Sequence, residues 1–546
     1  MNTLVIVLIA VVVLGAGYVF YGRHLAKKWG IDPKAETPAV KYNDGKDYVP
    51  TNGWTVFSHQ FSSIAGAGPV TGAIQAAVFG WLPVLLWILI GGVFFGAVTD
   101  FGALYASVKN QGKSMGMLIE KYIGKTGRKL FLLFCWLFSL LIIAVFADMV
   151  SGTFNAFDDV TGKLAANASV NGSAGMVSIM FMVFAVIFGL IQKKFNFSGW
   201  KEAVLGIVFI VASFAVGMQF PLEFSKTTWS YVVFVYIFFA AILPIWLMKQ
   251  PRDYMTTIMF VCMIVGAALG LVIGHPTMNL PVFTGFKNEQ LGTMFPILFV
   301  TVACGAVSGF HSLVSSGTSS KTIANEKDML KVGYGAMILE SVLAVLALCV
   351  AGAAAKNGIP AEGTPFQIFS SGVAGFFEKM GLSVHLSTVF MTMCVSALAL
   401  TTLDAVARIG RMCFQEFFSV DDMKHAKPWR KVVCNTYFST IVTLLCGFVL
   451  TKIGYQTIWP LFGSANQLLS ALVLITLCVF LKVTGRSNKM LFPPMIIMLC
   501  VTFTALVQRV IGLVKSLAAG TDIFASVIQL VVAVLLIVLA VIIAIN

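Results

Sequence analysis

The clearest shortage in this sequence is charge. Only 11% of the 546 residues are Asp, Glu, Lys or Arg, whereas 58% are hydrophobic and the mean hydropathy is +0.91. Soluble domains carry about 25% charged residues. Apolar runs of span length recur along the whole chain, and the longest polar stretches are too short to form cores of their own. The sequence therefore predicts an all-α polytopic membrane protein with no soluble domain.

Cysteine motifs are also missing, and the charges around the first apolar segment favour an anchor span. The ten cysteines are scattered and form no CxxC pair, which argues against a disulfide framework or a zinc site. No basic residue precedes the first apolar segment, 2–21, whereas Arg23, Lys27 and Lys28 follow it. This order is typical of a retained anchor span with its N-terminus outside, and not of a cleaved signal peptide.

Fifteen hydrophobic segments are expected to cross the membrane. In chain order they are approximately 2–21, 56–76, 80–106, 130–155, 175–192, 199–219, 229–249, 253–274, 291–316, 333–356, 385–407, 433–451, 456–481, 490–513 and 522–545. With the loop after the first segment in the cytoplasm, 29 of the 37 Lys and Arg residues fall on the inner side. This positive-inside bias places the C-terminus inside, and the net charge of +14 needs no nucleic-acid partner.

The second segment contains the stretch HQFSSIAGAGPVTG, residues 59–72, in which helix breakers and polar groups are concentrated. Inside a helix, Gly costs about 1 kcal/mol and Pro about 3 kcal/mol relative to Ala. Pro69 suits the first turn of a new helix, because its missing N–H is not needed there. In a membrane, unwound backbone occurs only where it is buried in protein or lines a cavity. The stretch therefore predicts two half-helices with a break at 65–68.

The ninth segment repeats this composition in ACGAVSGFHSLVSSGTSSK, residues 303–321. Seven segments separate the starts of the two broken helices, so they run in opposite directions, which indicates an inverted-repeat transporter. The alternative is that the small-xxx-small motifs at 68–72 and 305–309 only allow close helix packing. The inverted-repeat hypothesis predicts one integral membrane domain with a LeuT-like fold, divided into an anchor span at 1–21 and inverted repeats at 56–274 and 291–545.

The backbone exposed at such breaks suits a small ligand. The N-terminus of a half-helix presents N–H groups and a positive dipole end to a carboxylate, and imidazole adds donors or carries a coupled proton. For each histidine, the alternative is a packed, hydrogen-bonded side chain. The candidate substrate-binding residues are His59, Gln60, Ser63, Gly66, Gly68, Pro69, Ser308, Gly309, His311 and Ser312.

Carboxylates inside the expected spans are few, and each is a functional candidate by default. Asp404, with the hydroxyls before it, would form a sodium or proton site; the alternative is an ion pair with Arg408, four residues on. Asp100 and Glu340 could instead pair with lysines of nearby loops. The candidate ion-coupling residues are Thr401, Thr402, Asp404, Asp100, Asp148 and Glu340.

The motifs of this chain resemble those of the carbon starvation protein A (CstA) family of bacterial transporters. The resemblance covers most of the chain and is carried by HQFSSIAGAGPVTG, ILPIWLMKQPRDY (242–254), SGFHSLVSSGTSSK (308–321), TTLDAVARIGR (401–411) and WPLFGSANQLL (459–469). Gln60 stands where members often have a second histidine, and Ala73 where they have a proline. The resemblance implies an inner-membrane secondary transporter related to the amino acid–polyamine–cation superfamily, with uptake of pyruvate or peptides during carbon starvation and proton symport.

We therefore expect a secondary active transporter that imports pyruvate or a similar small carboxylate, with protons rather than sodium as the coupling ion. It would be neither an enzyme nor dependent on a cofactor, and its partners would be the substrate and the lipid bilayer. Peptide or amino-acid uptake is the alternative within the class. The alternatives from other classes are a channel and a membrane redox protein with His59 and His311 as haem or metal ligands.

Overall fold

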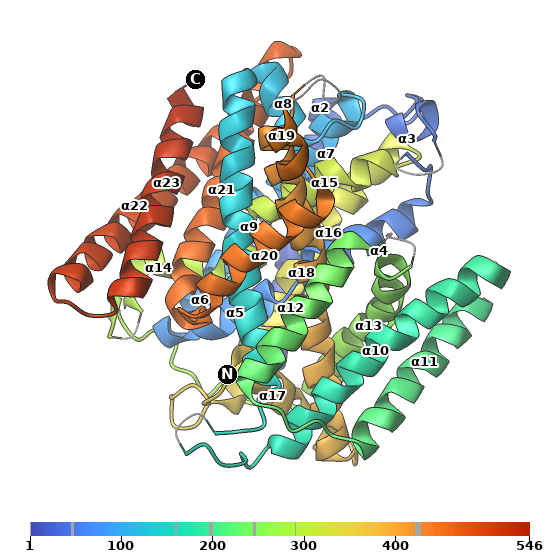
Figure 1. Ribbon diagram of the computed structural model, residues 1–546, viewed down its shortest axis with the longest axis vertical. Coiled ribbons are helices and arrows are strands. Elements are labelled where there is room, and N and C mark those ends of the chain that lie inside the picture. Colours follow the sequence, from blue (N-terminus) through green and yellow to red (C-terminus); the bar gives the residue numbers. More distant parts are fainter. Residues whose placement is uncertain are drawn as a thin grey trace.

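The computed structural model describes residues 2–44, 48–158, 161–195, 200–243, 247–289, 291–420 and 427–545 (Figure 1). The helices in the first half are α1 (Thr3–Ala16), α2 (Arg23–Trp29), α3 (Pro38–Lys41), α4 (Gly53–Ile64), α5 (Gly68–Ala76), α6 (Trp81–Gly91), α7 (Ala97–Lys109), α8 (Met115–Tyr122), α9 (Lys125–Thr153), α10 (Ala168–Phe195), α11 (Trp200–Gln219), α12 (Lys226–Ile242) and α13 (Lys249–Gly274).

A two-stranded antiparallel hairpin, β1 (Lys287–Asn288) with β2 (Gly292–Thr293), separates these helices from those of the second half. The second half contains α14 (Met294–Val302), α15 (Gly309–Gly317), α16 (Ala336–Ala354), α17 (Pro365–Lys379), α18 (Val384–Phe418), α19 (Pro428–Val433), α20 (Thr436–Thr451), α21 (Tyr455–Val483), α22 (Phe492–Ala518) and α23 (Ile523–Ile545).

Twelve helical stretches within the described residues are long and apolar enough to cross a membrane, which confirms a polytopic membrane protein. Three further expected segments correspond to shorter apolar helices, which span Gly68–Phe79, Lys226–Ile242 and Thr436–Thr451. The number of fifteen spans, like the inverted repeat, stays a prediction.

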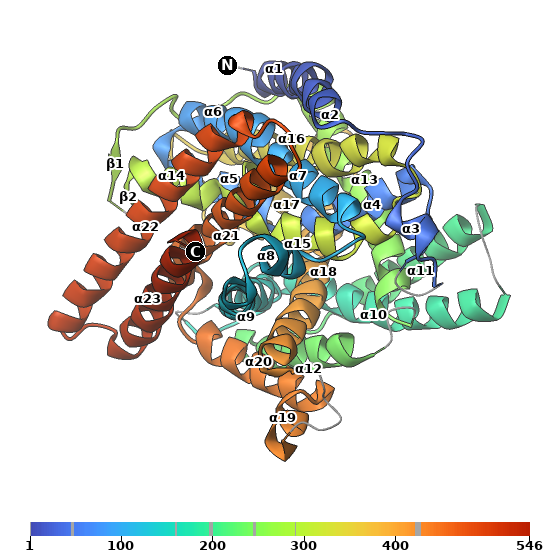
Figure 2. The same cartoon turned by 90° about the horizontal axis from the view of Figure 1, so that it is seen from above.

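The long helices α9, α18 and α21 form the middle of the bundle and pack directly on one another or on shared neighbours. Two helical hairpins flank this middle: α10 with α11 at one edge and α22 with α23 at the opposite edge (Figure 2). In the apolar 18-residue stretches of α9, α18 and α21, 83%, 89% and 89% of the residues are buried, against 22% in α11. Polar side chains on the central helices therefore contact protein, whereas most of the surface of α11 faces outward.

The first helix break lies between α4 and α5, where the sequence predicts it. Helix α4 ends at Ile64, and α5 begins at Gly68 with Pro69 in its first turn. Gly66 is required by a close approach, because a Cβ there would lie 2.4 Å from the Thr402 hydroxyl oxygen on α18. The break is fully buried, so its irregular backbone is shielded from lipid as the membrane requires.

The second break lies between α14 and α15. Helix α14 ends at Val302, Ala303 has a positive φ of 28°, and Ser308 is extended before α15 begins at Gly309. Gly309 packs against α21, where a Cβ would meet the Asn466 carbonyl oxygen at 2.5 Å. Contacts of α15 with α7 and α21, and of α5 with α14 and α16, bring both breaks into the centre of the molecule.

Candidate substrate and proton site

The two helix breaks border one small central cavity. Its lining comes from both broken helices and from α9, α18 and α21, and consists of Ile64, Gly66, Gly68, Phe138, Ile142, Phe146, Cys304, Phe310, His311, Thr402, Phe462 and Asn466. The cavity volume is about 20 Å³, which is room for about one water molecule. A larger ligand therefore requires the walls to move apart.

The cavity lining combines a few polar groups with a mainly apolar wall. Hydrogen-bonding groups come from His311, Thr402 and Asn466, with the start of α5 beside them at Gly68. Most of the apolar lining comes from α9 and α21, with Ile64 of α4, Phe310 of α15 and Cys304 completing it. Among the described residues, no Asp, Glu, Lys or Arg lines the cavity directly, and the titratable ring in its wall is that of His311.

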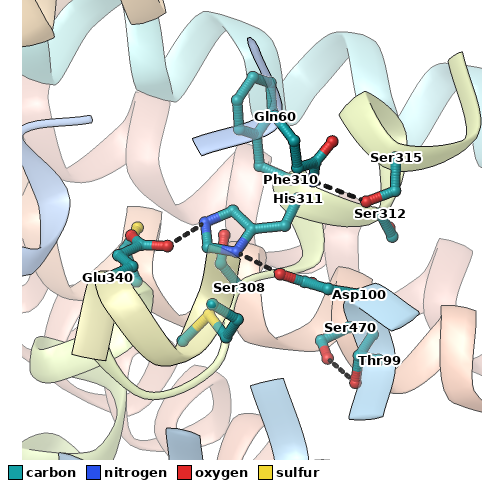
Figure 3. Close-up of polar contacts among 12 residues, drawn as sticks. Gln60, Thr99, Asp100, Ser308, Phe310, His311, Ser312, Ser315, Glu340 and Ser470 are labelled. Atoms are coloured by element: carbon teal, nitrogen blue, oxygen red, sulfur yellow. Dashed lines mark hydrogen bonds and ion pairs between the residues drawn. The ribbon is translucent and has the colours of Figure 1, made fainter. Parts of the chain in front are cut away.

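His311 is held between two carboxylates from different helices (Figure 3). Its Nδ1 lies 2.9 Å from Asp100 Oδ2 on α7 in a hydrogen bond, and its Nε2 lies 3.4 Å from Glu340 Oε2 on α16. The second contact has the distance of an ion pair without the geometry of a hydrogen bond. All three side chains are fully buried. Three of the candidate residues thus form a single cluster, with α15 contributing the imidazole.

The charge of this cluster depends on how many protons it holds. With both carboxylates ionised and the imidazole protonated, the cluster carries a net charge of −1, and one further proton makes it neutral. Burying an uncompensated charge is expensive, so a buried cluster of this kind favours neutrality. The acid–imidazole–acid arrangement is therefore able to bind and release a proton beside the cavity.

Other polar residues brace the two breaks. Gln60 on α4 donates from Nε2 to Ser315 Oγ at 2.8 Å and accepts from Ser319 Oγ at 2.6 Å, which ties α4 to α15 and the turn after it. Asn466 on α21 accepts the Phe310 N–H at 3.1 Å and donates from Nδ2 to Ser308 Oγ at 3.1 Å. Asn466 thus caps the start of α15 and also lines the cavity.

Several candidate substrate residues lie away from the cavity wall. His59 is half-buried on α4, and Ser63 is buried on the same helix. Ser312 is turned toward its own helix, where its hydroxyl donates to the Gly309 carbonyl at 2.5 Å. Pro69 shapes the start of α5. Of the ten predicted substrate residues, the cavity wall therefore includes Gly66, Gly68 and His311.

Asp404 belongs to a second buried cluster. Its carboxylate contacts the Arg252 guanidinium of α13 and accepts the Tyr236 hydroxyl of α12 at 2.6 Å. Arg408 instead donates to backbone carbonyls at the end of α12, among them that of Leu243 at 2.6 Å. The partner of Asp404 in this cluster is therefore Arg252, and not Arg408, four residues along α18.

The two hydroxyls before Asp404 lie in different places. That of Thr401 shares the Ala397 carbonyl with the Arg252 guanidinium, whereas Thr402 lines the cavity. Thr401 Oγ1 donates to the Ala397 carbonyl at 2.8 Å and Thr402 Oγ1 to the Leu398 carbonyl at 3.1 Å, both within α18. Thr402 faces the cavity, whereas Asp404 faces α12 and α13. The three residues therefore take part in two different environments.

Asp148 lies near the C-terminal end of α9, apart from both clusters. Its Oδ1 pairs with Lys226 Nζ at 2.8 Å, and its Oδ2 accepts the backbone N–H of Tyr455 at 2.9 Å. Tyr455 is the first residue of α21, so this carboxylate caps a helix start and benefits from its positive dipole end. The contacts of Asp148 therefore hold the end of α9 to the starts of α12 and α21.

Arg252 is the residue that sequence reasoning missed. Its position in KQPRDY, next to an expected loop, made it count as a cytoplasmic charge, yet its side chain is only 1% exposed. Within the described residues it is the one Lys or Arg that is fully buried. The partner is far away in sequence, and no local spacing rule connects Arg252 to Asp404.

Span-length helices packed around two broken helices, with an enclosed cavity between the breaks, define a polytopic membrane transporter. The chain belongs to the carbon starvation protein CstA family, whose sequence profile matches residues 2–359 and 349–505. The resemblance of its motifs to this family is thereby confirmed.

Named relatives include carriers of two substrate classes. The pyruvate/proton symporter BtsT of Escherichia coli (strain K12) is 31% identical over 92% of this chain and 81% of its own length. The peptide transporter CstA of the same strain is 30% identical over 88% of this chain and 77% of its own length. The peptide transporter CstA of Bacillus subtilis (strain 168) is 30% identical over 90% and 87%. The chain is thus a transporter and not an enzyme.

Proposed function

We propose that this chain is a secondary active transporter that imports pyruvate or a similar small monocarboxylate together with protons. The observation that carries the proposal is the central cavity, whose mainly apolar wall includes His311, the imidazole of a buried acid–imidazole–acid cluster. In a widened cavity, the carboxylate of the substrate would face Gly68 and His311. Its small apolar end would face the aromatic wall.

Proton coupling follows from the charges. A substrate carboxylate in contact with the His311 ring adds a negative charge beside a cluster that is neutral only when it holds an extra proton. For unit charges about 4 Å apart in an effective dielectric of 20, the interaction is worth about 4 kcal/mol, or roughly a thousandfold in affinity. Substrate and proton therefore bind together, and the release of one into the cytoplasm weakens the binding of the other.

A small carboxylate fits this wall better than a zwitterion does. The ammonium group of a peptide or amino acid needs acceptors, and the described residues that line the cavity include no carboxylate. Both nearby carboxylates, Asp100 and Glu340, contact the His311 ring and do not themselves line the cavity. Peptide uptake is the second candidate, because relatives named as peptide transporters match this chain as well as the pyruvate symporter does.

For the membrane topology we propose fifteen spans in a bacterial inner membrane, with an anchor span followed by inverted repeats at 56–274 and 291–545. The N-terminus would lie outside and the C-terminus inside. In support, the basic segments around α2, α8 and α19 lie at the same end of the molecule as the C-terminus (Figures 1 and 2). Positive charge gathered at one end is what the cytoplasmic side of such a protein carries.

The test is uptake of labelled pyruvate or a labelled dipeptide by proteoliposomes, under separate proton and sodium gradients. The proposal expects concentrative pyruvate uptake that a proton gradient drives and a protonophore abolishes. His311→Ala should abolish it with the protein still folded in the membrane, while His59→Ala, off the cavity wall, retains most of it. Uptake of the dipeptide alone, or uptake driven only by sodium, would refute the corresponding part of the proposal.

A further inference from the structure

A groove runs along the outer surface between the N-terminal helix and α6. Its volume is about 520 Å³, and it is lined by Val13, Ala16, Gly17, Phe20, Tyr21, His24, Leu89, Ile90, Val93 and Phe94. Figure 2 shows α1 at the edge of the bundle, next to α6. In the apolar 18-residue stretch of the N-terminal span, only 22% of the residues are buried, so we expect this face of the molecule to contact the bilayer.

The walls of the groove are irregular helices. The segment from Gly17 to Gly22 joins α1 to α2 with π-helical turns, and the segment from Gly92 to Gly96 joins α6 to α7 in the same way. Such π-helical turns are rare in proteins overall, and many of those that occur lie at functional sites. The two irregular segments contact each other, and a Cβ on Gly17 would meet the Val93 side chain at 2.6 Å.

A third π-helical segment, Leu330–Gly335, packs behind the first two and leads into α16. Its Tyr334 hydroxyl lies 2.9 Å from the Val93 carbonyl oxygen and 3.4 Å from that of Gly17, and it reaches both walls of the groove. Beyond these turns, α7 carries Asp100 and α16 carries Glu340. The groove thus adjoins the two helices that hold the carboxylates of the proton cluster.

The groove is apolar along its length and basic at one end. His24 lines it, and Lys28 lies four residues on, on the same face of α2. Arg23 and Lys27 are also exposed there. Within the described part of the chain, none of these three Lys and Arg residues forms an ion pair with a carboxylate. An apolar groove with these unpaired Lys and Arg side chains at one end suits an anionic phospholipid, whose acyl chain is apolar and whose headgroup is negatively charged.

We propose that this groove is a binding site for an anionic glycerophospholipid of the bilayer. One acyl chain lies between Phe20 and Phe94, and the phosphate accepts hydrogen bonds from His24 and Lys28. Occupancy would support the packing of the three π-helical segments through Tyr334, and with it the placement of α7 and α16. The lipid is therefore a bound partner and not one of the exchanging lipids that surround any membrane protein.

The test is native mass spectrometry of the full-length protein in detergent, titrated with phosphatidylglycerol or phosphatidylcholine of the same chain length. Wild-type protein should bind one phosphatidylglycerol with clear preference. A Lys or Arg near the headgroup is worth about 1 kcal/mol toward anionic lipid, or about fivefold. His24→Gln with Lys28→Gln should lower the preference at least fivefold. Ala16→Phe, which fills the groove, should abolish tight binding of either lipid.

Two matched controls isolate the site. Lys125→Gln removes an exposed charge at the start of α9, and Ala215→Phe adds a ring to the exposed face of α11, away from the groove. Both should bind phosphatidylglycerol as the wild type does. Lipid binding that Ala16→Phe leaves unchanged would overturn the proposal. So would a stable dimer that Ala16→Phe dissociates, because the groove would then be an interface between two copies.

Discussion

The pairing of Asp404 with Arg252 makes a sharp prediction about stability. Asp404→Asn removes one partner of a fully buried ion pair and weakens the compensation of the Arg252 guanidinium, which also has the buried Asp253 carboxylate nearby. Breaking a buried pair in this way costs about 3–5 kcal/mol, most of it from the uncompensated charge. Arg252→Met should cost a similar amount, since it removes the buried guanidinium that contacts the Asp404 carboxylate.

The same reasoning predicts a rescue. Replacing both charges with apolar side chains, as in Arg252→Met with Asp404→Leu, removes the desolvation penalty together with the attraction, and such replacements are often neutral or stabilising. The Tyr236 hydroxyl would then lose its acceptor, at a cost of about 1–3 kcal/mol, so Tyr236→Phe is added. The triple variant should recover at least half of the stability lost in Asp404→Asn.

The assay is the free energy of unfolding in mixed micelles, with the amount of folded protein in the membrane as a second readout. Lys226→Met is a control, because its ion pair with Asp148 is 38% exposed on the lysine side and worth at most about 1 kcal/mol. Two results would refute the reasoning. One is an Asp404→Asn variant as stable as the parent. The other is a rescue of that variant by substitution of Arg408 rather than Arg252.

Two further predictions concern packing around the breaks and the helix starts. Gly66→Ala places a Cβ 2.4 Å from Thr402 Oγ1 and should lower the free energy of unfolding by about 1–3 kcal/mol, with a loss of uptake. Adding Thr402→Ala to the same chain should restore stability. A double-mutant cycle that shows no coupling between the two positions would contradict the contact. Asp148→Ala should lower the free energy of unfolding by about 1–2 kcal/mol more than Lys226→Met does, because it also removes the acceptor for the Tyr455 N–H at the start of α21. Equal effects of the two substitutions would show that this helix cap contributes nothing.

The helix breaks could be predicted from local chemistry. The cost of glycine and proline inside a helix is a property of a few neighbouring residues, and the structure ends α4 at Ile64, directly before the predicted break at 65–68. The apolar runs likewise reveal spans, because each run is contiguous. The helices α12 and α20, with 17 and 16 residues, are shorter than the 18 residues of a candidate span.

Partners across the bundle could not be predicted in this way. The spacing rule for helices offered Asp404 a neighbour four residues on, whereas its actual partners come from α12 and α13. His311 and Glu340 were separate candidates in sequence, and only the packing of α15 against α7 and α16 against α7 unites them with Asp100. Long-range contacts depend on how helices pack, and no single segment contains that information.

The central claim is that pyruvate and protons move together through the cluster of His311, Asp100 and Glu340. The most direct measurement is the pH change outside pyruvate-free proteoliposomes when pyruvate is added. Wild-type protein should draw protons inward with the substrate. Asp100→Asn and Glu340→Gln should lose this proton movement yet retain exchange of labelled for unlabelled pyruvate. Pyruvate uptake without any proton movement in the wild type, or full coupling in both variants, would contradict the account.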